Sequence, residues 1–165
     1  MDIHMTENEK AQHFETLKHI KEVARLLGYM SIELTERGMH HDQTKLEEPE
    51  VHIFAEFTPK LFGLTYGSEE YKATLKEMSP AIKHHHGCNR HHPEYFAEEA
   101  KRKGLASPVD CMTLVDLVEM LCDWKAATLR HEDGDIVKSI DINRERFGIS
   151  DQLASILRNT ATQVF

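Results

Sequence analysis

The stretch MTLVDLVEMLCDWKAATLR, residues 112–130, carries apolar side chains on every side of a helical projection. A helix that is apolar all round is typical of the buried centre of a helical bundle. Elsewhere in the chain, apolar residues recur three and four positions apart, and strand-like alternation is nearly absent. The sequence therefore predicts an all-α fold, a helical bundle with this stretch inside it.

The rest of the chain predicts further helices around this central one. A chain of 165 residues fits one domain of ordinary size. We expect a single domain over residues 1–165, with its main motifs within 12–130 and its C-terminal helices, over 135–163, packing on them. The predicted helices cover residues 9–37, 47–57, 68–83, 95–102, 111–130 and 136–147, and the last one begins after Ser150. Gly38 predicts the end of the first helix, and residues 58–68 and 84–94 read as loops.

Composition and charge narrow the class of protein. A formal net charge of −8 repels a phosphate backbone, so general nucleic-acid binding is not expected, although a local cationic pocket can still bind a small phosphorylated ligand. The three cysteines include no CxxC pair, which is typical of a reduced, cytoplasmic chain. The N-terminus lacks an apolar signal core and no apolar run is long, so no membrane segment is expected.

Histidine is unusually frequent, with 12 residues, of which seven form three tight groups. Histidine is the commonest metal ligand in proteins. His41 is followed by Asp42, and an imidazole beside a carboxylate suits Zn, Mn, Fe and similar ions. The segment HHHGCNRHHPE, residues 84–94, offers five more histidines. So dense a cluster predicts further metal ligands; a structural zinc site and a solvated polar loop stay open as alternatives.

The first predicted helix carries His19 on the same face as Val23, Leu26 and Met30. This apolar face is predicted to point into the core of the bundle. His19 there can be a metal ligand, or a core histidine whose ring nitrogens are simply hydrogen-bonded.

The central stretch also carries three acids, Asp116, Glu119 and Asp123, on one stripe of its helix. An unpaired buried carboxylate costs several kcal/mol, so these acids need partners. A metal ion with histidine ligands would provide them, and salt bridges to Lys or Arg are the alternative.

The order of these motifs resembles the HD-domain superfamily of metal-dependent phosphohydrolases. The signature of that superfamily is a His, an adjacent His-Asp pair and a later Asp, all on helices. The matching residues are His19, His41, Asp42 and Asp123. The segment LCDWKAA, residues 121–127, is similar to the final motif, and HDQTK, residues 41–45, is similar to the His-Asp-x-x-Lys version. In that version additional histidines bind a second metal, a role that the resemblance offers here to His85, His86, His91 and His92.

The resemblance implies a bundle of HD-domain type that hydrolyses a small phosphorylated substrate, a nucleotide above all. It implies one or two divalent ions (Mn, Fe, Co, Zn or Mg) that lower the pKa of a water molecule for attack on phosphorus. Lys45 stands where the best-known nucleotidases carry Glu, and it is the first candidate for a phosphate contact. Candidates for proton transfer, or for orienting a ligand, are Glu119 and Asp116, and further substrate contacts are expected from Arg90, Trp124 and Lys125.

Two other functions fit the same residues. Two ions held by histidines and carboxylates suit a di-iron oxygenase as well as a hydrolase. A non-catalytic, metal-binding or regulatory helical module is the second alternative, and chelation would unfold such a protein. A homodimer is compatible with a helical chain of this size.

Overall fold

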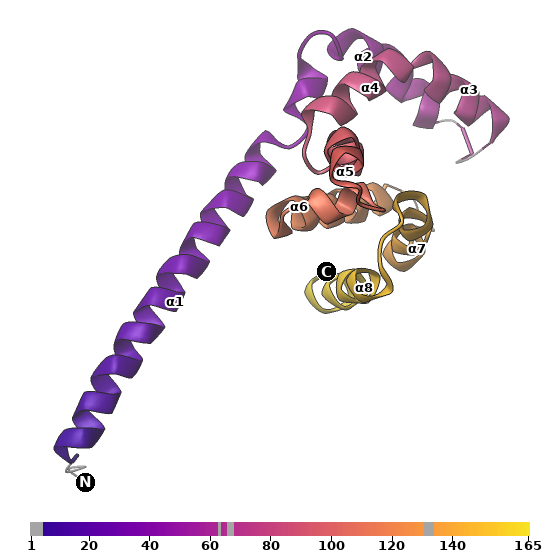
Figure 1. The fold of residues 1–165 in the computed structure, drawn as a ribbon. Coiled ribbons are helices and arrows are strands. Elements are labelled where there is room, and N and C mark those ends of the chain that lie inside the picture. The colour runs from indigo at the N-terminus through magenta and orange to yellow at the C-terminus, as the bar shows by residue number, and fades with distance from the viewer. Residues whose placement is uncertain (1–4, 63, 66–67, 131–133) are drawn as a thin grey trace. The chain divides into compact units, whose positions relative to one another are not determined.

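The computed structural model describes residues 5–62, 64–65, 68–130 and 134–165. All regular elements in these ranges are helices, as Figure 1 shows, so the prediction of an all-α fold is confirmed. Residue contacts divide the chain into two compact units, Met1–Met39 and His40–Phe165. No described helix combines the length and the apolar character that a membrane span requires.

The first unit consists of one long helix, α1 (Glu7–His40). Its N-terminus is capped by Thr6 and Glu9: the Thr6 hydroxyl accepts from the Glu9 backbone N–H at 3.3 Å, and Glu9 Oε2 accepts from the Thr6 N–H at 2.6 Å. The predicted stop at Gly38 is wrong, because the helix continues to His40. No residue of α1 is buried, so the apolar face that carries His19 has no core around it within this unit.

The second unit begins with a left-handed residue, Asp42, at φ 58°, followed by the 3-10 turn η1 (Gln43–Leu46). Helix α2 (Val51–Phe62) then runs further than predicted, with Pro59 inside it. Helix α3 (Glu69–Glu77) is capped by Ser68, whose hydroxyl accepts from the Tyr71 N–H.

The histidine-rich segment is not wholly the loop that the sequence predicted. Pro80, in the first turn of a helix, cannot continue the helix before it, so α3 ends and a new helix, α4 (Ser79–Cys88), begins. Residues 84–88 form the last turn of α4, and a short turn then carries His91 and His92 into η2 (Pro93–Phe96). The histidines therefore have helical as well as turn positions.

After η2 come α5 (Ala97–Lys103) and a second short turn, η3 (Pro108–Cys111). The bundle ends with three helices: α6 (Leu114–Thr128), α7 (Ile136–Phe147) and α8 (Asp151–Val164). The starts of α7 and α8 match the predicted ones, whereas α6 begins three residues later than predicted, because Pro108–Cys111 forms the separate turn η3. A Thr113–Asp116 capping box starts α6, and the Ser150 hydroxyl caps α8.

The core of the second unit lies where α6 packs against α7 and α8. Met120 and Leu121 of α6 meet Ile140 of α7 and Leu157 of α8 in one cluster of buried residues. Within the second unit, other sides of α6 are left uncovered, since Leu114 and Cys122 are exposed there. In this unit α6 therefore covers the core with one face, and its burial on every side stays a prediction.

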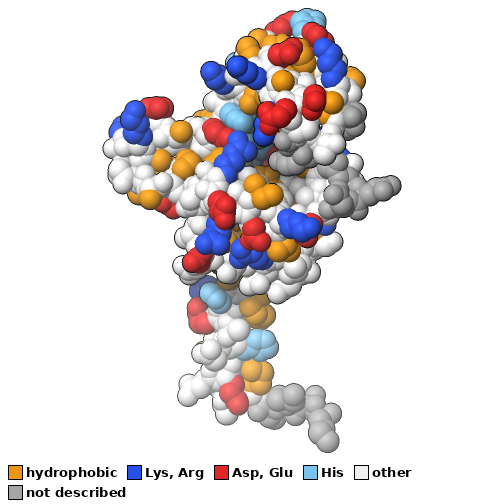
Figure 2. Space-filling view, turned by 90° about the vertical axis from the view of Figure 1, so that its right-hand side faces the viewer, with side chains coloured by type: hydrophobic (Ala, Val, Ile, Leu, Met, Phe, Trp, Pro, Cys, Tyr) orange, Lys and Arg blue, Asp and Glu red, His pale blue; other side chains and the backbone are white. Residues whose placement is uncertain are grey.

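Acidic and basic side chains are interspersed on the face of the molecule drawn in Figure 2. Many of them pair with a neighbour three or four residues along the same helix, as Lys72 does with Glu69 and Lys103 with Glu99.

The buried core predicts a clear contrast between two isoleucines of α7. Ile140 has no exposed surface, whereas Ile142 is 58% exposed. We expect Ile140→Ala to lower the free energy of unfolding by about 2–5 kcal/mol, because it leaves a cavity in the core. Ile142→Ala should change it by less than about 0.5 kcal/mol. Urea denaturation measures both values, and equal losses would contradict the packing described here.

Candidate metal centre

Four side chains of the second unit bring ligand atoms to within 4.8 Å of one another: Asp42, His85, His91 and His92. Asp42 lies in the left-handed turn after α1, His85 on α4, and the two other histidines in the turn that follows α4. The two imidazoles of His85 and His91 are almost completely buried. The turn that follows α4 therefore faces the turn that carries the His-Asp pair.

Each of these four residues has one buried atom without a hydrogen bond: Asp42 Oδ1 and the Nε2 atoms of His85, His91 and His92. Buried polar atoms are nearly always hydrogen-bonded, so four buried polar atoms that lie close together without hydrogen bonds need an explanation. Asp42 Oδ1 lies 3.0 Å from His85 Nε2 and 3.4 Å from His91 Nε2. Ligands bound at about 2.0–2.1 Å from one ion stand roughly 3.0–3.4 Å apart, so the donor set fits a divalent metal.

Carboxylates hold the far side of the buried rings. Glu50 Oε2 lies 2.9 Å from His85 Nδ1, and Glu119 Oε1 lies 3.1 Å from His91 Nδ1. A carboxylate that accepts the Nδ1–H leaves the Nε2 lone pair for a metal, which is the usual arrangement behind metal-binding histidines. The hydrogen-bond network therefore assigns both rings the tautomer that a metal requires.

Glu50 has no exposed surface and also binds His84 Nδ1 at 2.7 Å and the Thr44 hydroxyl at 3.0 Å. Sequence reasoning missed this residue, because it ends the polar run EEPE, residues 47–50, in the first turn of a predicted helix, where acids are ordinarily exposed to solvent. Nothing in the sequence distinguishes it from its exposed neighbours, and only the fold buries it.

A second group of ligands shares Asp42. His41 Nε2 lies 3.6 Å from Asp42 Oδ2 and 3.5 Å from Asp123 Oδ1. The Nδ1 atom of His41 lies 3.0 Å from Glu119 Oε1, so one carboxylate positions both His41 and His91. Because the two oxygens of Asp42 face different groups, the arrangement can hold two ions bridged by this carboxylate.

The acids and histidines shift one another's protonation. Hydrogen bonding to Asp123 and then to Glu119 raises the pKa of His41 to about 10. Burial alone would lower the pKa of His91, but the attraction of the nearby Asp42 and Glu119 carboxylates outweighs it and raises this pKa. Burial and the neighbouring histidines His91, His86 and His85 lower the pKa of His92 to about 2. The metal-free centre therefore attracts positive charge while keeping His92 a neutral ligand.

Asp42 is held as a carboxylate. Burial by itself would raise its pKa, but His85, His91 and Lys45 outweigh burial and hold the pKa well below the usual range. Lys45 lies with Nζ 2.5 Å from Asp42 Oδ2 and 5.3 Å from the centre of the Phe54 ring. The predicted phosphate contact Lys45 is therefore beside the bridging carboxylate.

The structure brings His86 to the edge of the same centre. His86 and His92 form a third group with Glu94, a residue that sequence reasoning did not single out. Glu94 Oε1 lies 3.5 Å from His86 Nδ1, while its buried Oε2 has no hydrogen bond. Burial is the main cause that lowers the pKa of His86.

Two of the predicted site residues, Arg90 and Asp116, form a salt bridge with each other and do not belong to the metal-capable groups described here. The guanidinium of Arg90 donates to both oxygens of the fully buried Asp116, at 3.0 and 2.9 Å, and Asp116 also accepts from the backbone N–H and hydroxyl of Thr113. The salt-bridge alternative therefore describes Asp116, whereas Glu119 and Asp123 join the metal-capable groups. The catalytic role predicted for Asp116 and the substrate contact predicted for Arg90 stay predictions.

His19 lies on α1, in the first unit, whereas the four metal-capable groups consist of residues from 41 to 123. Its predicted role as a ligand stays a prediction.

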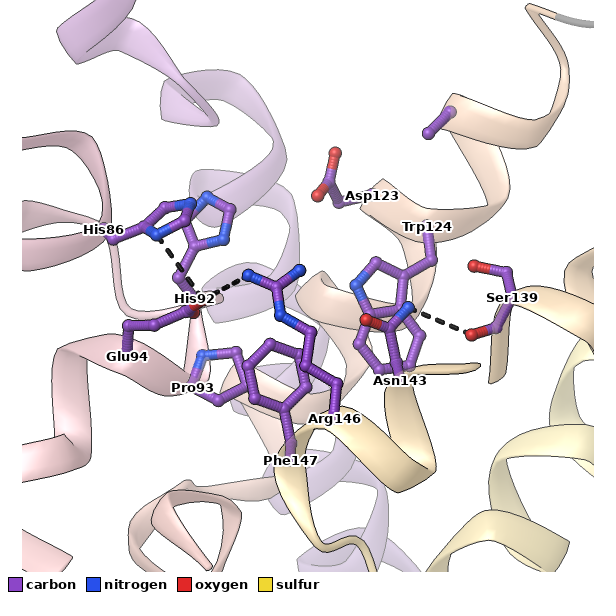
Figure 3. A pocket seen from close by; sticks show the side chains of 11 residues that line it. His86, His92, Pro93, Glu94, Asp123, Trp124, Ser139, Asn143, Arg146 and Phe147 are labelled. Carbon is purple, nitrogen blue, oxygen red and sulfur yellow. Dashed lines mark hydrogen bonds and ion pairs between the residues drawn. The ribbon is translucent and has the colours of Figure 1, made fainter. Parts of the chain in front are cut away.

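A cavity of about 240 Å³ opens beside the centre (Figure 3). His86, His92 and Asp123 form part of its wall, and Trp124 lines it while also packing against the core. Lys125 is not among its lining residues. The substrate contacts predicted for Trp124 and Lys125 stay predictions.

Comparison with known proteins yields one family. The family described as "Family of unknown function (DUF5662)" matches residues 8–163 of the chain. The chain belongs to this family. No curated protein and no solved structure matches it. The segment matched to DUF5662 contains all residues of the metal-capable groups.

The histidine-orienting carboxylate gives a first prediction for this DUF5662 protein. We expect Glu119→Gln to weaken the binding of Mn²⁺ or Zn²⁺ about 10- to 100-fold, because two ligand rings lose their partner. Glu98→Gln, an exposed acid on α5, is the control and should bind metal as the wild type does. Competition with a chromophoric chelator measures the affinity, and an unchanged affinity in Glu119→Gln would exclude this centre.

The raised pKa of His41 gives a second prediction, for the chelator-treated protein. A pKa of about 10 in the folded state exceeds the ordinary 6.5, so charged His41 contributes stability that is complete below pH 6.5 and is lost as the pH rises through 10. The unfolding free energy should therefore fall between pH 7 and 10 more steeply in the wild type than in His41→Gln. Urea denaturation in EDTA at several pH values measures this difference, and identical slopes would contradict it.

Proposed function

We propose that this DUF5662 protein is a metal-dependent phosphohydrolase that acts on a small phosphorylated molecule, with nucleotides as the leading class. The observation that carries the proposal is the convergence of four buried donor atoms without hydrogen bonds, at Asp42, His85, His91 and His92. His41 and Asp123 adjoin them through Asp42. This combination of a His-Asp pair, later histidines and a final Asp on a helix supports the resemblance to the HD-domain superfamily.

The residues divide into two sets of ligands. Asp42 Oδ1 with His85, His91 and His92 would hold one ion, and Asp42 Oδ2 with His41 and Asp123 would hold a second. A divalent ion bound there supplies a Lewis acid that activates water and offsets the charge of a phosphoryl group. Imidazole and carboxylate ligands suit Zn, Mn, Fe and Co equally, so the donor set does not choose among them.

The surrounding residues have supporting roles in this proposal. Glu50 and Glu119 fix the orientation of the ligand rings before a substrate arrives. Lys45, which lies against Asp42, balances part of the negative charge of the carboxylates and can donate to a phosphoryl oxygen. Asp123 borders both a ligand group and the cavity, so the cavity gives a substrate access to the centre.

The test is an assay of purified protein against a panel of phosphomonoesters and nucleotides, with Mn²⁺, Co²⁺, Mg²⁺ or Zn²⁺, after its metal content has been measured. We expect activity that depends on metal and that falls at least about 100-fold in Asp42→Asn, since this residue is shared by both ligand groups. His52→Gln is the control, because His52 is exposed on α2 and its one described ion pair is with Glu48, in the turn before this helix. A wild type without metal, or an Asp42→Asn variant with full activity, would overturn the proposal.

The bridging position of Asp42 also favours a second candidate, a di-iron oxygenase, because a carboxylate between two mixed histidine and carboxylate groups suits two irons. Iron as the bound metal, with oxygen consumption and no phosphate release, would favour this candidate over the hydrolase.

A further inference from the structure

The cavity beside the candidate metal centre is lined in part by residues that do not belong to the metal-capable groups. Its histidine side is formed by His86, His92 and Glu94, and the opposite wall comes from two helices of the core (Figure 3). Helix α6 contributes Asp123, Trp124 and Ala127, and α7 contributes Ser139, Asn143, Arg146 and Phe147. A small polar cavity that joins metal-ligating groups to uncommitted polar side chains has the composition of a ligand pocket.

Arg146 is the single Lys or Arg among the described residues that line this cavity. Of the other cations that the sequence offered for phosphate binding, Arg90 is held by both oxygens of Asp116 and Lys45 by Asp42. The third, Lys125, does not line the cavity. Arg146 is 56% exposed, so a ligand can reach it from solvent. An anion in the cavity would therefore meet Arg146 as its cationic partner.

The guanidinium of Arg146 is held ready for such a contact. Its Nη2 donates to Glu94 Oε1 at 2.7 Å, and its central carbon lies 4.6 Å from the centre of the Phe147 ring. These two contacts direct the group toward the histidine side of the cavity, as Figure 3 shows. A guanidinium carries five N–H donors in a planar fork, so one contact with Glu94 leaves it the capacity to bind a further oxyanion.

We propose that Arg146 binds the anionic group of the substrate, and that the substrate is a small phosphomonoester whose organic part lies against Trp124. This inference rests on the proposed function. The cavity of about 240 Å³ is smaller than the range of about 300–1,000 Å³ that encloses drug-sized ligands. It therefore suits a single phosphorylated unit rather than a dinucleotide.

Asn143 adds a second recognition group to the same wall. Its Nδ2 donates to the Ser139 carbonyl oxygen at 3.0 Å, one turn earlier on α7, which leaves its Oδ1 to accept a hydrogen bond. A substrate with a hydroxyl or N–H group near its phosphate matches this acceptor. Arg146 and Asn143 would then select on charge and on hydrogen bonding from one helix.

The experiment compares two arginines of α7. Arg144 lies two residues before Arg146, binds Asp151 at 2.8 Å and does not line the cavity. Inorganic phosphate is titrated calorimetrically into the wild type, Arg146→Met and Arg144→Met, each loaded with Mn²⁺ and with its metal content measured. We expect phosphate affinity to fall about 10- to 100-fold in Arg146→Met, with unchanged metal content, and to stay within twofold in Arg144→Met. Arg146→Lys should lie between, because lysine keeps the charge and loses the fork.

The outcomes separate the two proposals. Wild-type affinity for phosphate in a metal-loaded Arg146→Met variant would overturn the role of Arg146 and leave the metal centre standing. Loss of metal from this variant would also overturn it, because Arg146 would then support the centre rather than the ligand. A wild type that binds none of Mn²⁺, Zn²⁺, Fe²⁺, Co²⁺ and Mg²⁺ would overturn the proposed function itself. A dinucleotide that competes with phosphate as well as a mononucleotide does would overturn the inferred substrate size.

Discussion

Hydrogen bonds from histidine Nδ1 to two carboxylates are the interactions on which the centre depends. Glu50 holds His85, and Glu119 holds His41 and His91. Each bond removes the Nδ1 atom from competition and leaves Nε2 to face Asp42. Without these carboxylates, the rings of His85 and His91 would lose the hydrogen bonds that set their tautomer and keep their Nε2 atoms facing Asp42.

The same carboxylates explain why acids can be buried in this small bundle. A buried charge is strongly destabilising unless it is paired and hydrogen-bonded. Glu50, with no exposed surface, is surrounded by two imidazoles and a hydroxyl. Asp116 is paired with a guanidinium and with the first turn of α6. Each buried acid is therefore paired with an oppositely charged or hydrogen-bonding group. The main partners, His84 and His85 for Glu50 and Arg90 for Asp116, come from segments that are far away in the sequence.

Much of this arrangement can be read from the sequence where local rules apply. The boundaries of α7 and α8 follow from caps such as Ser150, and the metal-capable residues His41, Asp42 and Asp123 follow from motif order. Residues that matter only through tertiary contact gave no such signal. Glu50 sits in an acidic turn, Glu94 ends the segment 84–94 that the sequence predicted as a loop, and Arg146 lies in the predicted helix over 136–147. The break between α3 and α4 shows a further limit, because the sequence predicted one helix over 68–83 and Pro80 instead lies in the first turn of a new helix.

The capping box of α6 has a consequence for register. Asp116 and Glu119 stand one helical turn apart, and their partners Arg90 and His91 are consecutive in the chain. The spacing of Asp116 and Glu119 on α6 thus fixes the positions of both Arg90 and His91 in the turn after α4. A shift of that turn by one residue would replace a guanidinium with an imidazole opposite Asp116 and unseat a ligand in the same movement. The correct alignment of this turn with α6 and the placement of His91 in the centre therefore depend on the same pair of contacts.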